Sequence, residues 1–275
     1  MIVLLLSVLI GVSVGSFLNV VIYRLPIILR YEWQQLCAQL PHNSLIYNLQ
    51  KTNFNLLYPR SHCPQCKHSL RIRDNIPCLS YVYLRGKCRY CQQYISPRYL
   101  LIEIITAVMS VFLIWHFNLT WQAFTASIFG GYLLTLVMID IDEHLLPDIL
   151  TLSLLWLGLT VNLFGLFTDI HSAIIGVLTG YLSLWLLSKG FSTITGKIGM
   201  GHGDFKLFAA LGAWLGWQTL PFVILIASIM GTLAVLTLIA IKGYKRDTPI
   251  AFGPFLALAG WLNLLLGQQL LKWYL

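Results

Sequence analysis

The sequence has little charge, and acidic charge is scarcest. Only 10% of its 275 residues are charged, and ten residues are Asp or Glu. Soluble globular domains have about 25% charged residues, so the composition excludes an ordinary soluble protein. Because 57% of the residues are hydrophobic and the mean hydropathy is +0.75, we expect an all-α protein that crosses a membrane many times.

The signatures of two hydrolase classes are absent as well. The chain has no Asp-Thr-Gly or Asp-Ser-Gly triplet of soluble aspartic proteases and no His-Glu-x-x-His zinc site. The glycines at 199, 201 and 203 have GxGxG spacing and follow no strand, which disfavours a Rossmann nucleotide site. If the chain is a hydrolase, its carboxylates remain as the catalytic groups.

Long runs without charge, or nearly so, predict about eight transmembrane helices. A helix needs about 20 apolar residues to cross a bilayer. The run Phe205–Trp217, the sixth of the eight, has only 13 residues and is too short to span without tilting or flanking residues. The other runs are Ile2–Tyr23, Tyr99–Phe117, Trp121–Ile139, Ile149–Phe167, Ala173–Ser188, Leu220–Ile241 and Ile250–Leu271.

One polar insertion divides the chain into a first transmembrane helix (1–23), a loop with a small compact module (24–98) and a transmembrane domain (99–275). The segment 24–98 has 11 Lys or Arg against two acids. If it lies in the cytoplasm and the helices alternate, 17 of the 18 basic residues are cytoplasmic, as the positive-inside rule requires. The net charge of +8 then indicates contact with anionic membrane lipids and not with nucleic acid.

Four of the six cysteines form two Cys-x-x-Cys pairs, Cys63 with Cys66 and Cys88 with Cys91, 21 residues apart. This spacing is typical of a tetrahedral zinc site. All four ligand positions would be filled, so we expect a structural zinc that supplies folding energy to a small segment. A redox dithiol or unliganded thiols are the alternatives, and a cytoplasmic location disfavours disulfides.

Asp140 and Asp204 lie at the ends of apolar segments, 64 positions apart. A carboxylate at membrane depth costs about 2.5–3.5 kcal/mol, so it usually has a function. Asp140 ends a predicted helix, where the helix dipole opposes an acid, so capping does not explain it. Two carboxylates that converge can act as an acid/base pair, one protonated and one ionised.

The neighbouring residues allow simpler interpretations. Asp148 follows a proline and opens the next apolar run, so we expect it to be the helix N-cap. An N-cap role is also the alternative for Asp204. The preceding glycines, Gly201 and Gly203 among them, permit positive φ and close backbone approach, which capping alone does not need. Asp142 and Glu143 are expected to keep their connection hydrated.

Five segments spread along the chain carry a more specific signal. They are GSFLNVVIYRLP at 15–26, the run 63–99 with CPQC, LRGKCRYC and ISPRY, IDIDEHLLPD at 139–148, GMGHGDFKL at 199–207 and TPIAFGPFLALAG at 248–260. Together they resemble the type IV prepilin peptidases, which are bifunctional leader peptidases and N-methyltransferases. In that family the first aspartate of an Asp-x6-Pro motif and the GxGD aspartate are catalytic, which corresponds to Asp140 and Asp204. Gly201, Gly203 and Asp148 would support them.

The resemblance implies a reaction and a location. The enzyme would remove the short basic leader of type IV prepilins and type II secretion pseudopilins at a Gly–Phe bond. It would then methylate the new N-terminal amine with S-adenosylmethionine, for which the sequence identifies no binding residue. It would lie in the bacterial inner membrane, with its active site and zinc module on the cytoplasmic side.

Two other functions remain as alternatives. The first is a membrane transporter or proton relay that uses intramembrane carboxylates, although both aspartates are expected at helix ends on one face. The second is a presenilin-like GxGD protease, although its Tyr-Asp and Pro-Ala-Leu motifs are absent.

Overall fold

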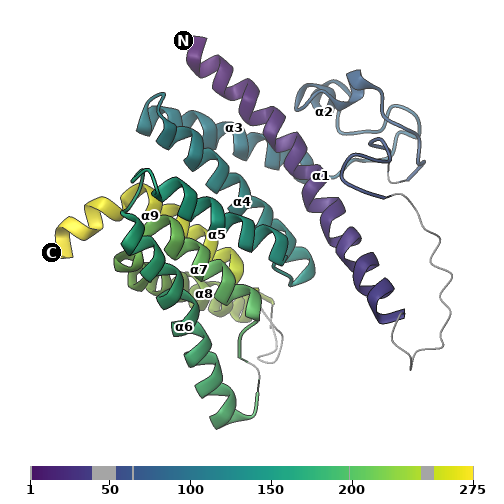
Figure 1. Cartoon of the computed structure of the whole chain (residues 1–275). Coiled ribbons are helices and arrows are strands. Elements are labelled where there is room, and N and C mark those ends of the chain that lie inside the picture. The colour runs from purple at the N-terminus through teal and green to yellow at the C-terminus, as the bar shows by residue number, and fades with distance from the viewer. Residues whose placement is uncertain (1, 39–53, 64, 198, 243–250, 275) are drawn as a thin grey trace. The chain divides into compact units, whose positions relative to one another are not determined.

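A computed structural model describes residues 2–38, 54–63, 65–197, 199–242 and 251–274. These residues form helices and turns with two isolated β-bridges and no strand, which confirms the all-α class. They group into two compact units, Met1–Asn118 and Leu119–Leu275 (Figure 1). The units follow helix packing, whereas the division at residues 23 and 98 follows membrane topology and stays a prediction.

The first unit is built on two long helices, α1 (Ile2–Ala38) and α3 (Arg98–Phe117). They pack closely because glycines face α3 where the helices meet. A Cβ built on Gly11 would lie 2.7 Å from the Cα of Ala107, and one on Gly15 would meet the Thr106 side chain. Small residues four apart let membrane helices approach in this way.

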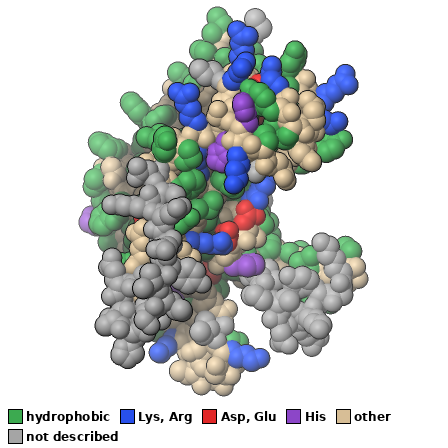
Figure 2. All heavy atoms as spheres, turned by 90° about the vertical axis from the view of Figure 1, so that its right-hand side faces the viewer, with side chains coloured by type: hydrophobic (Ala, Val, Ile, Leu, Met, Phe, Trp, Pro, Cys, Tyr) green, Lys and Arg blue, Asp and Glu red, His purple; other side chains and the backbone are tan. Residues whose placement is uncertain are grey.

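The described part of the segment between these helices, from residue 54 on, is compact and basic. It contains the 3-10 helix η1 (Ile72–Asn75), the short helix α2 (Leu79–Tyr83) and the four paired cysteines. Figure 2 shows Lys and Arg side chains gathered around it. The exposed ones are Arg60, Lys67, Arg71, Arg73, Arg85 and Arg89.

The second unit surrounds one short helix, α7 (His202–Leu215). From Asp204 to Leu215 every residue except Lys206 is buried. Gly176 and Gly212 let α6 (Ile170–Thr195) and α7 touch through their backbones. The Trp214 indole donates a 2.8 Å hydrogen bond to the carbonyl of Leu154. The surrounding helices are α4 (Trp121–Glu143), α5 (Asp148–Asn162), α6 (Ile170–Thr195), α8 (Leu220–Lys242) and α9 (Gly253–Tyr274), with η2 (Trp217–Thr219) before α8 (Figure 1).

Each of the eight predicted runs coincides with a helix in the described residues. Five helices there are long and apolar enough to cross a membrane: α1, α3, α4, α6 and α8 with its preceding turn. The helix α5 and the stretch Gly253–Gly267 of α9 are apolar but shorter. The helix α7 has 14 residues. The chain is therefore a multi-pass membrane protein, while the count of eight crossings stays a prediction.

Several helix ends differ from the predicted runs, and two of them bear on the domain division and the packing. The first helix continues beyond Tyr23 to Ala38 with Pro26 inside it. The fourth ends at Asn162 and not at Phe167, because the buried Asn162 side chain binds neighbouring backbone. Its Nδ2 donates to the carbonyls of Ala213 and Trp214, and its Oδ1 accepts from the N–H groups of Phe167 and Thr168. Residues 39–53 of the predicted loop 24–98 lie outside the described residues.

Candidate functional site

Asp140 lies in the last turn of α4 and is 5% exposed. The helix ends three residues later, and His144 adopts a left-handed conformation with φ of 49°. The His144 N–H donates back to the carbonyl of Asp140 over 3.0 Å. This turn fixes the end of α4, so the carboxyl of Asp140 is held at the point where the chain leaves the helix.

Asp204 lies in the first turn of α7 and is 9% exposed. The N-cap of this helix is Gly201, so the alternative that Asp204 is the N-cap is wrong. The two residues bond reciprocally: the Gly201 N–H donates to the Asp204 carboxylate, and the Asp204 N–H donates to the Gly201 carbonyl over 3.2 Å. A helix N-terminus favours negative charge at this position.

Of the two glycines before Asp204, Gly203 serves close packing, and neither Gly201 nor Gly203 has an unusual backbone angle. Gly201 has a φ of −75° and Gly203 is helical, so the expected positive φ is wrong for both. A Cβ on Gly203 would lie 2.7 Å from the Cβ of Leu146, whereas one on Gly201 would lie 3.6 Å from Asp204 Oδ2, an ordinary contact. Gly203 thus needs to be glycine because Leu146 occupies the space.

Leu146 links the two aspartates to the start of α9. A Cβ on Gly253 would lie 3.3 Å from Leu146 Cδ1 and 2.5 Å from Asp140 Oδ2. The Gly253 N–H donates a hydrogen bond to the Asp140 carboxylate. Because Leu146 also touches Gly203, the ends of α4, α7 and α9 meet around one side chain, and the Asp140 and Asp204 carboxylates interact electrostatically.

This arrangement leaves one acceptor available. Asp140 Oδ2 is buried and has no hydrogen-bond partner among the described residues. A buried oxygen normally has a partner, and its absence at such a position is often functional. Two interacting carboxyl groups with a free buried oxygen can hold a water molecule or a substrate carbonyl and exchange a proton with it.

Asp148 does not cap α5, contrary to the sequence expectation. The N-cap is Pro147, whose backbone precedes the helix, and Asp148 is the first helical residue. Its carboxylate instead accepts from Lys206 Nζ, 2.6 Å from each oxygen. The pair is partly exposed, so it contributes no more than about 1 kcal/mol. It ties the start of α5 to α7 two residues after Asp204.

The two Cys-x-x-Cys pairs have the same local structure. The Cys63 N–H donates to the carbonyl of His68 over 3.0 Å, and the Cys88 N–H donates to that of Gln93 over 2.9 Å. Each turn is closed by an antiparallel β-bridge, His62 with Ser69 and Lys87 with Tyr94. Residues 67 and 92, each four after the first cysteine of its pair, have positive φ of 55° and 57°. The repeated turn presents both thiols of each pair on the same side.

The four sulfur atoms fit a tetrahedral metal. All lie within 4.8 Å of one another, and the Sγ atoms of Cys63 and Cys91 are 3.8 Å apart. A tetrahedron with Zn–S bonds of about 2.3 Å has edges of about 3.8 Å. The cluster can therefore hold a metal such as zinc. Cys37 and Cys78, which have no Cys-x-x-Cys partner, are not part of it.

Sequence reasoning missed three residues of the site around the aspartates: Gly253, Leu146 and Lys206. Gly253 belongs to the FGPF part of 248–260, the last of the five segments that carry the family resemblance. The sequence assigned no role to this glycine. Leu146 is one apolar residue among many. Lys206 follows Asp204 closely, but its partner Asp148 is distant in sequence, so no local pattern predicts their contact.

Comparisons with known proteins agree with this division. A family model described as the bacterial peptidase A24 N-terminal domain matches residues 9–117, which end where the first compact unit ends. A second model, described as the type IV leader peptidase family, matches residues 127–236 and includes both aspartates. No solved structure matches the chain.

Curated relatives match nearly the whole chain. A protein of Aeromonas hydrophila is 48% identical over 265 residues, which cover 96% of this chain and 91% of the relative. One of Pseudomonas aeruginosa is 45% identical over 269 residues, 98% and 92% of the two chains. One of Legionella pneumophila is 45% identical over 265 residues, 96% and 92%. Each is called prepilin leader peptidase/N-methyltransferase. The chain belongs to the type IV leader peptidase family.

Proposed function

We propose that the protein is a membrane aspartic endopeptidase that removes the basic leader of type IV prepilins and type II secretion pseudopilins at a Gly–Phe bond. The observation that carries the proposal is the meeting of Asp140 and Asp204, two buried and interacting carboxyl groups, at the ends of α4 and α7. The names of the relatives, quoted above, support the substrate class.

The two carboxyl groups have complementary roles in the proposed reaction. Like charges this close favour a state with a single shared proton. The ionised carboxylate takes a proton from a water molecule, whose oxygen attacks the Gly carbonyl carbon. The protonated carboxyl donates a hydrogen bond to the carbonyl oxygen. When the C–N bond breaks, the Phe nitrogen receives a proton, and the leader leaves as a carboxylate.

Five residues around the pair have supporting roles in this proposal. The Gly253 N–H orients the Asp140 carboxylate, and Gly201 does the same for Asp204. Gly203 permits the contact with Leu146 that brings the elements together. The pair of Asp148 and Lys206 fixes the start of α5 against α7.

We further propose that the enzyme methylates the new N-terminal amine and that its methyl donor is S-adenosylmethionine. The relatives' name includes N-methyltransferase. When bound, the donor supplies an electrophilic methyl group. The cysteine cluster holds a structural zinc, since all four of its positions are protein thiolates and none is left for a substrate.

The proposed location is the bacterial inner membrane, with the active site and the basic module of 24–98 on the cytoplasmic side. The distribution of Lys and Arg supports this orientation. Eight membrane crossings, with residues 99–275 as the peptidase domain, are consistent with it. The apolar helix of the substrate would stay in lipid while its basic leader stays in water.

A transporter or proton relay is not favoured. Such a path needs ionisable groups at successive depths of the bilayer. Here Asp140 and Asp204 form one cluster, and the relatives are called peptidases.

The purified protein, reconstituted into lipid vesicles with a prepilin, should release the leader and leave Phe as the new N-terminus, as read by mass spectrometry. Asp140→Asn should abolish release. The matched control is Asp142→Asn, two residues along and exposed, which should cleave like the unmodified enzyme. Release by Asp140→Asn at an undiminished rate would refute the proposed role of Asp140.

A further inference from the structure

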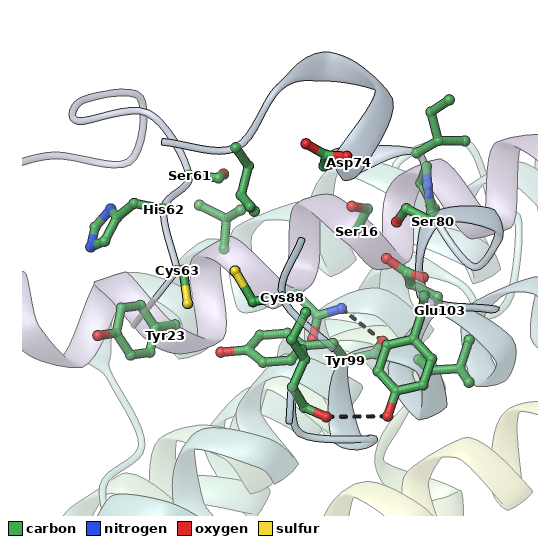
Figure 3. A pocket seen from close by; sticks show the side chains of 18 of the residues that line it. Ser16, Tyr23, Ser61, His62, Cys63, Asp74, Ser80, Cys88, Tyr99 and Glu103 are labelled. Carbon is green, nitrogen blue, oxygen red and sulfur yellow. Dashed lines mark hydrogen bonds between the residues drawn. The ribbon is translucent and has the colours of Figure 1, made fainter. Parts of the chain in front are cut away.

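The first unit contains a cavity of about 200 Å³ between α1, the start of α3 and the cysteine-containing segment. Figure 3 shows Asp74, Ser80 and Glu103 on one side of it and His62 with Tyr23 on the other. The peptidase mechanism does not use this cavity, because both catalytic aspartates belong to the second unit.

The cavity wall holds two buried carboxylates. Asp74 is 8% exposed, and neither of its oxygens accepts a hydrogen bond from a described residue. The Arg89 guanidinium pairs with this carboxylate: its Nη2 lies 2.8 Å from Asp74 Oδ1. The Arg89 side chain is 43% exposed. Glu103 is also 8% exposed and accepts a 2.7 Å hydrogen bond from the Cys78 N–H. Asp74 therefore already has a cation, whereas Glu103 is held by a neutral backbone donor, and a buried carboxylate is costly unless positive charge reaches it.

Besides His62, one basic residue lines the cavity among the described residues, Arg24. Its hydrogen bonds do not go to the two acids. Its Nη1 donates to the carbonyls of Asn55 and Leu56, and its Nη2 to that of Pro59. Arg24 therefore holds the segment that precedes the first cysteine pair. The role of Arg24 in the cavity wall is structural, and it is not a counter-ion for Asp74 or Glu103.

The pKa of Cys78 reports the character of this space. Burial and the neighbouring Glu103 carboxylate raise the pKa of its thiol to about 11, so the surroundings oppose a second negative charge. Three tyrosines, Tyr23, Tyr81 and Tyr99, line the same cavity. Carboxylates together with aromatic faces are the groups that recognise organic cations.

We infer that this cavity binds the positively charged sulfonium end of the methyl donor, with Glu103 as the group that selects its charge. The inference rests on the proposed methyltransferase activity and adds a binding site to it. Pockets that enclose whole drug-sized ligands measure about 300–1,000 Å³. At about 200 Å³ this cavity is smaller, so we assign to it the sulfonium end and not the entire donor.

Charge selectivity can be measured directly with two nearly isosteric ligands. S-adenosylmethionine has a sulfonium, and S-adenosylhomocysteine has a neutral thioether in its place. Binding of each to the full-length, zinc-loaded protein in detergent micelles is measured by calorimetry. Glu103→Gln keeps an acceptor for the Cys78 N–H but removes the charge. It should weaken the sulfonium ligand about tenfold and the thioether less than twofold.

The matched control is Glu32→Gln, the same charge change at an exposed position of α1 in the same unit. It should leave both affinities unchanged, and unchanged zinc content and thermal unfolding of Glu103→Gln show that the first unit of this variant is folded. Equal weakening of both ligands, or of neither, in Glu103→Gln would overturn the cavity assignment. Absence of both donor binding and methyl transfer in the unmodified protein would instead refute the transferase part of the proposed function.

Discussion

At the scale of single residues, the proposed active site depends on contacts between positions far apart in the chain. Asp140 is held by the N–H of Gly253, and Asp204 by that of Gly201. The aspartates themselves are predictable from sequence, because a carboxylate next to an apolar run is costly and needs a reason. Gly253 is not predictable in this way, since its role arises only when α9 packs against the end of α4.

Gly253→Ala should greatly reduce leader cleavage. The new Cβ would lie 2.5 Å from Asp140 Oδ2 and 3.3 Å from Leu146 Cδ1, so the carboxyl must move. A displacement of about 1 Å at a catalytic group can cost about 100-fold in rate. The rate of leader removal in vesicles checks this.

Gly231→Ala is a matched control, because the nearest atoms to its Cβ would be the rings of Phe252 and Phe255, at 3.5 Å or more. It should cleave at close to the unmodified rate. A Gly253→Ala enzyme that is as active as this control would show that Asp140 does not need the space.

Asp148 shows where a local rule fails at the residue scale. An aspartate after a proline and before an apolar run is a common N-cap pattern. Here the helix begins one residue earlier than that pattern predicts, with Pro147 as the N-cap, and the carboxylate pairs with Lys206. Tertiary contact decided the role, and the sequence distance of 58 residues hides it.

At the scale of elements, α7 is the helix that positions the site. The sequence predicts a short helix here, and its length left its place in the membrane open. In the structure α7 is enclosed by other helices of the second unit, so its 14 residues need not cover the bilayer alone. The close approach of α6 depends on glycine in both helices: a Cβ on Gly176 would lie 2.5 Å from the carbonyl oxygen of Gly212.

Gly176→Ala should destabilise the second unit by about 1–3 kcal/mol, because overpacking against a rigid backbone has no cheap relief. Thermal unfolding in detergent measures the change. Gly190→Ala is the control in the same helix α6, where no atom lies within 4 Å of the new Cβ. It should be neutral or slightly stabilising, since Ala favours helix over Gly. Equal transition temperatures for the two variants would argue against a tight α6–α7 crossing.

The cysteine-containing segment is the second element with a testable requirement. Its small size gives it little core, so metal binding should supply much of its folding energy. Cys63→Ser removes a buried ligand of the cluster and should lower the bound zinc well below one equivalent, as measured by mass spectrometry of the metal.

Cys37→Ser provides the comparison, because Cys37 is exposed and lies outside the cluster. Its zinc content should not change. Unaltered zinc in Cys63→Ser would count against the four-cysteine site. The spacing of the pairs predicts this site from sequence alone, because both turns are local and each needs only four consecutive residues.

At the scale of the whole molecule, hydropathy predicts the helices well but not their packing. Apolar runs identify every long helix in the described residues, because a membrane helix must be apolar throughout its length. They do not reveal that α7 is central, or that α3 packs with α1 in one unit and α4 begins another. These arrangements depend on contacts between glycines and other helices, and the hydropathy pattern does not show which glycine meets which helix.

The central claim is that Asp140 and Asp204 act as one catalytic unit. It is tested most directly by the single-turnover rate of leader removal in Asp140→Asn, Asp204→Asn and the double variant, with Asp142→Asn as control. Residues that act as a unit lose nearly the full effect with the first substitution. We predict that each single variant falls at least about 1,000-fold, as catalytic groups do, and that the double variant is no slower than either. Near-normal cleavage by one single variant, or losses that multiply in the double variant, would contradict the account.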